Sequence, residues 1–231
     1  GFYDLADDIE KTLMEDFANF MTGEAISDDK YLNEFIKYYR LVSNFEKRNA
    51  DGFKPAKQYF DKITSLKDIN DWQEKLYDLT MMGLPNPFPL YVEPDMKDTQ
   101  HYALYASVPS LILPDKTYYE ENHPQAEALL SVYRQMVLAL FERAGYDNNF
   151  AQATLEKALA FDKSLAPVQK DSTERADYAK SYNKYSFEDY TAFSKSVDLG
   201  AFAKKLIGQT PDQVNVDEPK YYEALETLIN P

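Results

Sequence analysis

The segment from Gly83 to Glu120 differs from the rest of the chain in the spacing of its hydrophobic residues. Two runs, Leu90 to Glu93 and His101 to Val108, are rich in aromatic and β-branched residues, and turn-forming residues separate them. Alternate residues of the second run fall on opposite faces, with Tyr102, Leu104, Ala106 and Val108 on one and His101, Ala103, Tyr105 and Ser107 on the other. This alternation predicts a β-hairpin with one buried face and one partly wet face. Prolines on both sides, at 85, 87, 89, 109 and 114, prevent a helix from continuing into it.

Before this segment, hydrophobic residues recur every three to four positions, which predicts amphipathic helices. The first runs from Leu5 to near Gly23. The second is capped by Asp28 and carries an apolar face from Leu32 to Phe45. A third begins at Pro55, and a fourth opens at Ser65 or Asp68 and ends before Gly83.

After the hairpin the helical spacing returns. Pro124 is predicted to start a long helix that stops at Gly145, and Asp147 caps another that ends before Pro167. Residues 168–185 are polar and aperiodic. Shorter elements follow: a helix capped by Ser186, a helix from Asp198 to Gly208, a brief strand within 210–216, and a last helix from Pro219.

The predicted fold class is therefore mainly α: a multi-helix lobe with one β-hairpin between two helical blocks. The expected division is a first helical block over residues 1–83, the hairpin and its proline-rich flanks over 84–120, and a second block over 121–231. No fixed-period repeat is present, which argues against a helical solenoid.

The net charge and the composition of the chain exclude some classes of binding partner. Lys+Arg total 25 against Asp+Glu 39, for a net charge of −14, and such a field repels phosphate backbones and anionic membrane surfaces. We therefore expect neither nucleic acid nor a membrane as partner. The chain has no cysteine, so it forms no disulfide and no thiolate metal site.

The residues that carry common chemistries are sparse. The two histidines, His101 and His123, lie in the hairpin and in a loop, and neither has a partner four residues away, so no His-Glu-x-x-His zinc motif can form. Adjacent acids occur at Asp7-Asp8, Asp28-Asp29 and Glu120-Glu121, but neighbours on a helix do not face each other, and 39 acids make such pairs common. The sequence thus predicts no catalytic residue and no metal ligand, and it leaves the substrate-binding residues unknown.

The aromatic side chains and Arg175 each have two possible roles. The 19 tyrosines and 14 phenylalanines mostly fit core packing, while Tyr102, Tyr105, Tyr118 and Tyr119 could instead form a wall that contacts a peptide. Arg175 is the only arginine of the polar stretch. We expect it to pair with a neighbouring acid such as Glu174 or Asp177, with contact to another lobe as the alternative.

Several short motifs resemble the N-terminal region of the neprilysin-type zinc endopeptidases, and in particular their bacterial endopeptidase O group. They are Gly1-Phe2-Tyr3-Asp4-Leu5, Gly83-Leu84-Pro85-Asn86-Pro87-Phe88, Asp95-Met96-Lys97, Leu111-Ile112-Leu113-Pro114, Tyr118-Tyr119-Glu120 and Tyr182-Asn183-Lys184. Their order and spacing cover essentially the whole chain. The absence of cysteine favours a bacterial member, since animal members carry disulfides.

The resemblance implies a segment of a longer, two-lobed enzyme in which a helical lobe covers a zinc-bearing lobe and admits only oligopeptides. It implies oligopeptide substrates, the protein's own C-terminal catalytic domain as partner, zinc in the full-length enzyme and none in this segment. Family members bind the substrate carboxylate through arginines near the first helix, but residues 4–8 contain no arginine. We expect a cytoplasmic protein, with a secreted or cell-surface location as the alternative, and self-association of the segment. The competing functional hypothesis is a non-enzymatic, acidic helical protein-binding module.

The histidine spacing generates a first prediction. The isolated chain should hold no stoichiometric zinc and cleave no peptide, because it lacks the ligand set and the general base. Metal analysis after chelation and re-addition of zinc checks this, and one tightly held zinc per chain would contradict it.

Overall fold

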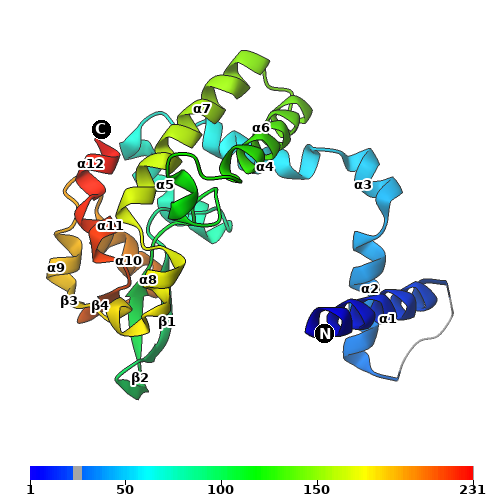
Figure 1. The fold of residues 1–231 in the computed structure, drawn as a ribbon, viewed down its shortest axis with the longest axis horizontal. Coiled ribbons are helices and arrows are strands. Elements are labelled where there is room, and N and C mark those ends of the chain that lie inside the picture. The colour runs from blue at the N-terminus through cyan, green and yellow to red at the C-terminus, as the bar shows by residue number, and fades with distance from the viewer. Residues whose placement is uncertain (23–27, 231) are drawn as a thin grey trace. The chain divides into compact units, whose positions relative to one another are not determined.

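A computed structural model describes residues 1–22 and 28–230. The end predicted for the first helix, Gly23, lies outside these residues. The α-helices are α1 (Phe2–Thr22), α2 (Lys30–Val42), α3 (Phe45–Asp51), α4 (Lys54–Thr64), α5 (Ile69–Met81), α6 (Ala126–Arg143), α7 (Asn148–Leu165), α8 (Ser172–Ala176), α9 (Phe187–Thr191), α10 (Leu199–Ile207), α11 (Pro219–Glu223) and α12 (Leu225–Ile229). The 3₁₀-helices are η1 (Lys116–Tyr119), η2 (Ala166–Val168) and η3 (Tyr178–Ser181), and the strands are β1 (Leu90–Asp95), β2 (Asp98–Ala106), β3 (Lys184–Ser186) and β4 (Gln213–Val216). The protein is mainly α, as predicted (Figure 1).

The chain forms two compact units, residues 1–61 and 62–231. In the first unit α1 packs on α2 through aromatic rings, since the Phe17 centroid lies 4.8 Å from that of Phe35 and 5.3 Å from that of Tyr39. The Arg40 guanidinium donates to the Phe20 carbonyl across the same contact, at 3.1 Å. The apolar face of α1 stays open to solvent, with Leu5, Ile9 and Leu13 each about half exposed.

The helix predicted from Leu32 to Phe45 is two helices, and this prediction is corrected. Asn44 separates α2 from α3 because its side chain accepts a hydrogen bond from Lys47 N and so caps a new helix. The cap of α2 is Asp29 rather than Asp28, with Asp29 Oδ1 accepting from Tyr31 N at 2.7 Å.

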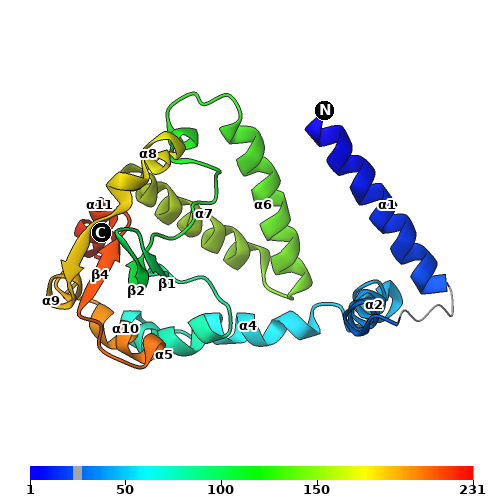
Figure 2. The ribbon, with the colours of Figure 1, turned by 90° about the horizontal axis from the view of Figure 1, so that it is seen from below.

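The second unit is built on a four-stranded sheet of order β1-β2-β4-β3. The predicted hairpin is present as the antiparallel pair β1–β2, closed by the turn at Met96-Lys97. The predicted strand near 210–216 is β4, which lies parallel to β2 with Leu104 opposite Val214. Strand β3 comes from the stretch that showed no periodicity, and it pairs antiparallel with β4. Figure 2 shows β1, β2 and β4 with α5, α7, α10 and α11 around them.

One face of this sheet forms the hydrophobic core. Leu104, Ala106, Val214 and Val216 are buried there against α5, α7, α9, α10, α11 and α12. Tyr221 and Tyr222 of α11 also lie in this core, and their hydroxyls donate to the carbonyls of Pro87 and Ser107. The core therefore holds the proline-rich flanks of the hairpin as well as its strands.

The opposite face was expected to be partly wet, and this expectation is only half right. Tyr105 on that face is 1% exposed, because its ring stacks on Tyr91 at 5.0 Å and its hydroxyl donates to the Pro94 carbonyl. Tyr102, assigned to the core face, is 75% exposed because it lies beyond the end of the β2–β4 pairing.

In the second helical block, α6 begins at Ala126 rather than at Pro124. Residues 121–125 form turns ahead of it, and its N-cap, Gln125, makes no side-chain capping bond. Asp147 caps α7 as predicted, and α6 and α7 lie side by side, joined by an Arg134–Glu156 ion pair. No helix among the described residues combines the length and the hydrophobicity needed to cross a bilayer.

The buried hairpin face generates a second prediction. Leu104→Ala should lower the free energy of unfolding by about 2–4 kcal/mol, because it removes a fully packed side chain and leaves a cavity. The matched control is Val92→Ala, a truncation on the same face at a 55% exposed position, which should cost under about 1 kcal/mol. Chemical denaturation of both variants measures the difference, and equal effects would place Leu104 outside the core.

Candidate functional site: a polar pocket beside the sheet

A cavity of about 610 Å³ lies beside the polar face of the sheet. Strand β1 contributes Tyr91 and Glu93, and the segment after β2, residues 107–114, forms one wall. The other wall is residues 169–181, the stretch that the sequence showed to be polar and aperiodic, and Asp217 and Glu218 follow β4 into the cavity. We call this cavity the polar pocket.

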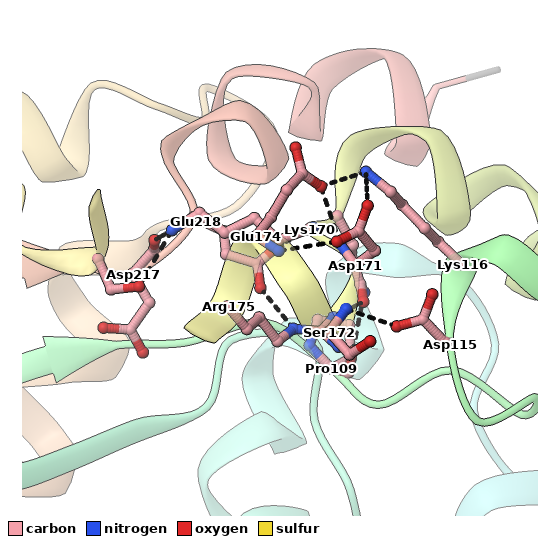
Figure 3. Close-up of polar contacts among 12 residues, drawn as sticks. Pro109, Asp115, Lys116, Lys170, Asp171, Ser172, Glu174, Arg175, Asp217 and Glu218 are labelled. Carbon is pink, nitrogen blue, oxygen red and sulfur yellow. Dashed lines mark hydrogen bonds and ion pairs between the residues drawn. The ribbon is translucent and has the colours of Figure 1, made fainter. Parts of the chain in front are cut away.

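Glu218 joins the two walls of the polar pocket. It is 5% exposed, and its two carboxylate oxygens accept from Lys170 N at 2.6 Å and from Arg175 Nε at 3.1 Å (Figure 3). Arg175 in turn donates to Gln169 Oε1, and Gln169 Nε2 donates to the Pro109 carbonyl at 2.8 Å. A buried carboxylate is tolerated only when its oxygens are satisfied in this way, so the network fixes residues 169–175 against Pro109.

Lys170 holds the end of the same wall. Its ammonium donates to the Asp217 carbonyl at 2.8 Å, to the Lys180 carbonyl at 3.1 Å and to Ser181 Oγ at 3.1 Å. One cation therefore gathers three backbone or hydroxyl oxygens from two segments that are far apart in sequence, using all three donors of the ammonium group.

A second set of contacts connects α8 to η1. Ser172 N donates to Asp115 Oδ2 at 2.7 Å, and Lys116 forms an ion pair with Glu174. Asp171 and Glu174 also form a capping box at the start of α8, which orients Glu174 toward Lys116. The Lys116 ammonium is the main reason that the pKa of Glu174 falls to about 2. We call the Lys116–Glu174 and Asp115–Ser172 contacts the α8 latch.

Burial changes two acid–base groups in the pocket. Tyr91 donates its hydroxyl to Asp217 Oδ2 at 3.0 Å, and desolvation raises the pKa of both the tyrosine and the aspartate above their usual values. Serines 107, 110 and 181 line the pocket, but no histidine does. The pocket therefore offers hydroxyl and carboxyl groups that can form hydrogen bonds with a ligand.

The two histidines lie away from the polar pocket. His101 Nδ1 is 2.8 Å from Asp98 Oδ2 on the exposed hairpin, and the His123 ring packs at a tilt against Tyr118 ahead of α6. Within residues 1–22 and 28–230, no three His, Asp or Glu side chains are grouped so that they could hold a metal ion. Of the adjacent acids, Asp29 has a structural role as the N-cap of α2.

The four tyrosines considered for a peptide wall occupy different environments. Tyr105 is buried against the sheet, while Tyr119 donates to buried Asp162 and accepts from Leu113 N at 3.1 Å. Tyr102 is open to solvent on the hairpin, and Tyr118 contacts His123. None of the four lines the polar pocket.

The partner expected for Arg175 is wrong. Glu174 pairs with Lys116 and Asp177 pairs with Lys180, which leaves the Arg175 guanidinium to Glu218, a residue from beyond β4. The sequence carried no signal for Glu218, Lys170 or Asp217, because their partners come from segments that only the sheet brings together.

The α8 latch generates a third prediction. The pKa of Glu174 in the folded protein lies below its usual value of 4.5, so the ion pair contributes stability that is fully present above about pH 4.5 and is lost as the pH falls toward 2. Glu174→Gln keeps an acceptor for the capping box but removes the charge. Near neutral pH the free energy of unfolding of the wild type should exceed that of this variant by less than about 1 kcal/mol, because the Glu174 side chain of the pair is half exposed. Thermal melts of both proteins from pH 7 to pH 2 should show the gap closing; a gap independent of pH would contradict the assignment.

Comparisons with known proteins identify a matching family and similar structures. The model of peptidase family M13 matches residues 1–231. The neutral endopeptidase of Lactobacillus helveticus is 34% identical over 224 residues, which cover 96% of this chain and 34% of that protein. The crystal structure of PepO from Lactobacillus rhamnosus superposes with a TM-score of 0.82 at 22% identity, covering 98% of this chain and 35% of that one. Mycobacterium tuberculosis zinc metalloprotease Zmp1, in complex with an inhibitor, gives a TM-score of 0.78 at 21% identity, with the same coverage.

The chain thus spans about a third of the length of these relatives. Its match lies in the region that the family model describes as N-terminal. The resemblance seen in the sequence motifs is confirmed, and the chain belongs to peptidase family M13 as an N-terminal region of a neprilysin-like, PepO-type metallopeptidase.

Proposed function

We propose that this chain is the non-catalytic N-terminal segment of a zinc-dependent oligopeptide endopeptidase, in which it covers the active-site cavity and limits the size of the substrate. The activity, the zinc and the peptide substrates belong in this proposal to the longer protein. The proposed partner of the segment is the C-terminal catalytic domain of the same polypeptide.

One observation carries the proposal: all 231 residues match a metallopeptidase family, yet the chain contains no His-x-x-x-His pair. Its residues do not fit a zinc ion, because the two histidines lie on separate elements and the described residues offer no group of three ligands. We therefore assign no step of peptide hydrolysis to this chain, and we look for its role in positioning and exclusion.

The contacts of the second unit support such a role. A wall that excludes large substrates has to resist deformation, and residues 169–181 are held by Glu218, by Lys170 and by the α8 latch rather than by a single surface contact. A satisfied, buried polar network fixes one geometry because any displacement leaves buried groups unpaired.

The exposed apolar residues support a covering partner. Leu5, Ile9 and Leu13 share one face of α1, and Phe2 and Tyr3 at its start are more than four-fifths exposed. Such a surface favours burial against another part of the longer protein. In the isolated segment the same surface would promote self-association, more strongly at high salt because salt screens the net charge of −14. We keep a cytoplasmic location as the working proposal, with secretion or surface display as the alternative.

The test measures how efficiently the longer protein cleaves peptides of increasing length. We expect short oligopeptides to be cleaved, long peptides to be cleaved severalfold less efficiently, and folded proteins to resist. Glu218→Ala should weaken this discrimination, because it leaves Arg175 and Lys170 N without their buried partner. Glu223→Ala is the matched control, since Glu223 is exposed on the neighbouring helix.

Two outcomes would contradict the proposal. If the Glu218→Ala variant shows the same dependence of cleavage on peptide length as the wild type, this segment does not select substrates by size. Full peptidase activity in the isolated chain would show that it carries catalytic groups, and a parent protein without any peptidase activity would favour the non-enzymatic binding module.

A further inference from the structure

The turn of the β1–β2 hairpin lies beyond a break in the strand pairing. Residues 99–101 of β2 have no opposite residue on β1, because Pro94 pairs with Tyr102 and Asp95 pairs with Asp98. These three residues form a bulge, which interrupts the ladder of backbone hydrogen bonds and bends the strand. The turn therefore needs contacts other than the ladder to hold it in one position.

A cluster of side chains supplies these contacts. It joins two of the short motifs noted in the sequence, since Asp95 and Tyr182 are 87 residues apart. Asp95 Oδ1 accepts from the Tyr182 hydroxyl at 2.8 Å, and Asp95 Oδ2 accepts from the Lys184 ammonium at 2.6 Å. The Lys97 ammonium lies 4.3 Å from the centroid of the Tyr182 ring, within the range of a cation–π contact. We call these contacts the hairpin latch.

The carboxylate at the centre of the hairpin latch is buried and fully used. Asp95 is 5% exposed, and its Oδ1 atom also accepts from Lys97 N at 2.9 Å. The contact with Lys184 is the main reason that the pKa of Asp95 lies well below its usual value, and the same contact raises the pKa of Lys184. Opening the latch would leave buried acceptors without donors, which opposes movement of the turn.

The other half of the hairpin latch is fixed to the sheet. Asn183 lies between the two latch residues, and its side-chain amide donates to the Val216 carbonyl at 3.0 Å. Its own carbonyl accepts from Val216 N at 2.9 Å. Lys184 belongs to β3 and lies opposite Asn215 of β4, an interior strand of the sheet. The motif at 182–184 is therefore the fixed part, and the hairpin turn is the part that it holds.

The hairpin turn also forms part of the polar pocket. Met96, at the tip of the turn, lines the pocket on one side, and Ser181, directly before Tyr182, lines it on the other. Met96 N donates to the Tyr105 hydroxyl at 3.3 Å, and this hydroxyl donates to the Pro94 carbonyl at 3.1 Å. The position of the turn thus determines how far the pocket is closed at this end.

We propose that residues 95–98 are a flap at the rim of the polar pocket, and that the hairpin latch holds this flap closed. The bulge at residues 99–101 supplies the bend about which the flap moves, and opening of the latch widens the entrance of the pocket. This inference does not rest on the proposed endopeptidase function, because it concerns only the pocket and its rim.

The first test follows amide hydrogen exchange by NMR in two latch variants. Tyr182→Phe removes a single hydroxyl, and Lys184→Met removes the ammonium, while both keep the acceptors of the Met96 and Lys97 amides. These two amides should exchange at least about fivefold faster in each variant, because the flap opens more often. The double variant should show a larger increase than either single variant.

The matched control is Lys180→Met, which removes a lysine of the same wall that pairs with Asp177 on the surface. It should leave the exchange of the turn amides unchanged. The amide of Leu155 in α7, a buried residue, reports global opening. Unchanged exchange of Met96 and Lys97 in both latch variants would overturn the proposal. An equal acceleration at Leu155 would also overturn it, because the latch would then stabilise the whole unit rather than the flap.

The second test measures access to the polar pocket. A small neutral nitroxide in solution enhances the relaxation of the amide protons that it approaches, and Ser107 lines the pocket. The enhancement at Ser107 should be at least about twofold larger in the Tyr182→Phe/Lys184→Met variant than in the wild type, relative to Leu155 in each protein. Equal enhancement in the two proteins would show that the flap does not control access, and the proposal would be overturned.

Discussion

The parallel pairing of β2 with β4 is the constraint on which the second unit depends. It places Leu104 beside Val214 and Ala106 beside Val216, and these residues form the sheet side of the core. Bringing together segments so distant in the chain carries an entropic cost that the burial of apolar surface offsets. The helices of the second block then pack on a surface that neither segment could present by itself.

The same pairing creates the polar pocket. Because β4 ends at Val216, the next two residues, Asp217 and Glu218, enter the space beside Tyr91 and Pro109. The carboxylate of Glu218 then becomes the acceptor around which residues 169–175 are organised. The polar pocket is thus a consequence of where β4 ends.

The two sides of the sheet have different roles in this account. The core side resists change because its side chains are close-packed, and the effect of a substitution there is felt as a loss of stability. The polar side resists change because its charged groups are satisfied only in one arrangement. A segment that serves another part of a longer protein as a wall needs both properties, since its shape has to persist when peptide or solvent occupies the space beside it.

The sequence by itself determined the elements whose signals are local. The alternation from Leu90 to Val108 predicted the hairpin, the apolar spacing predicted α1, α5 and α7, and Asp147 predicted the start of α7, because strand periodicity and helix capping depend on neighbouring residues. Its motifs also indicated the family.

The tertiary structure decided the remaining features. Residues 168–185 carried no period, yet they form α8, η3 and β3, since their hydrogen bonds go to Asp115, Asp217 and Glu218 rather than along the segment. The partner of Arg175 and the exposure of Tyr102 were decided in the same way, by the long-range pairing that brings Glu218 to the pocket and stops before the tip of the hairpin.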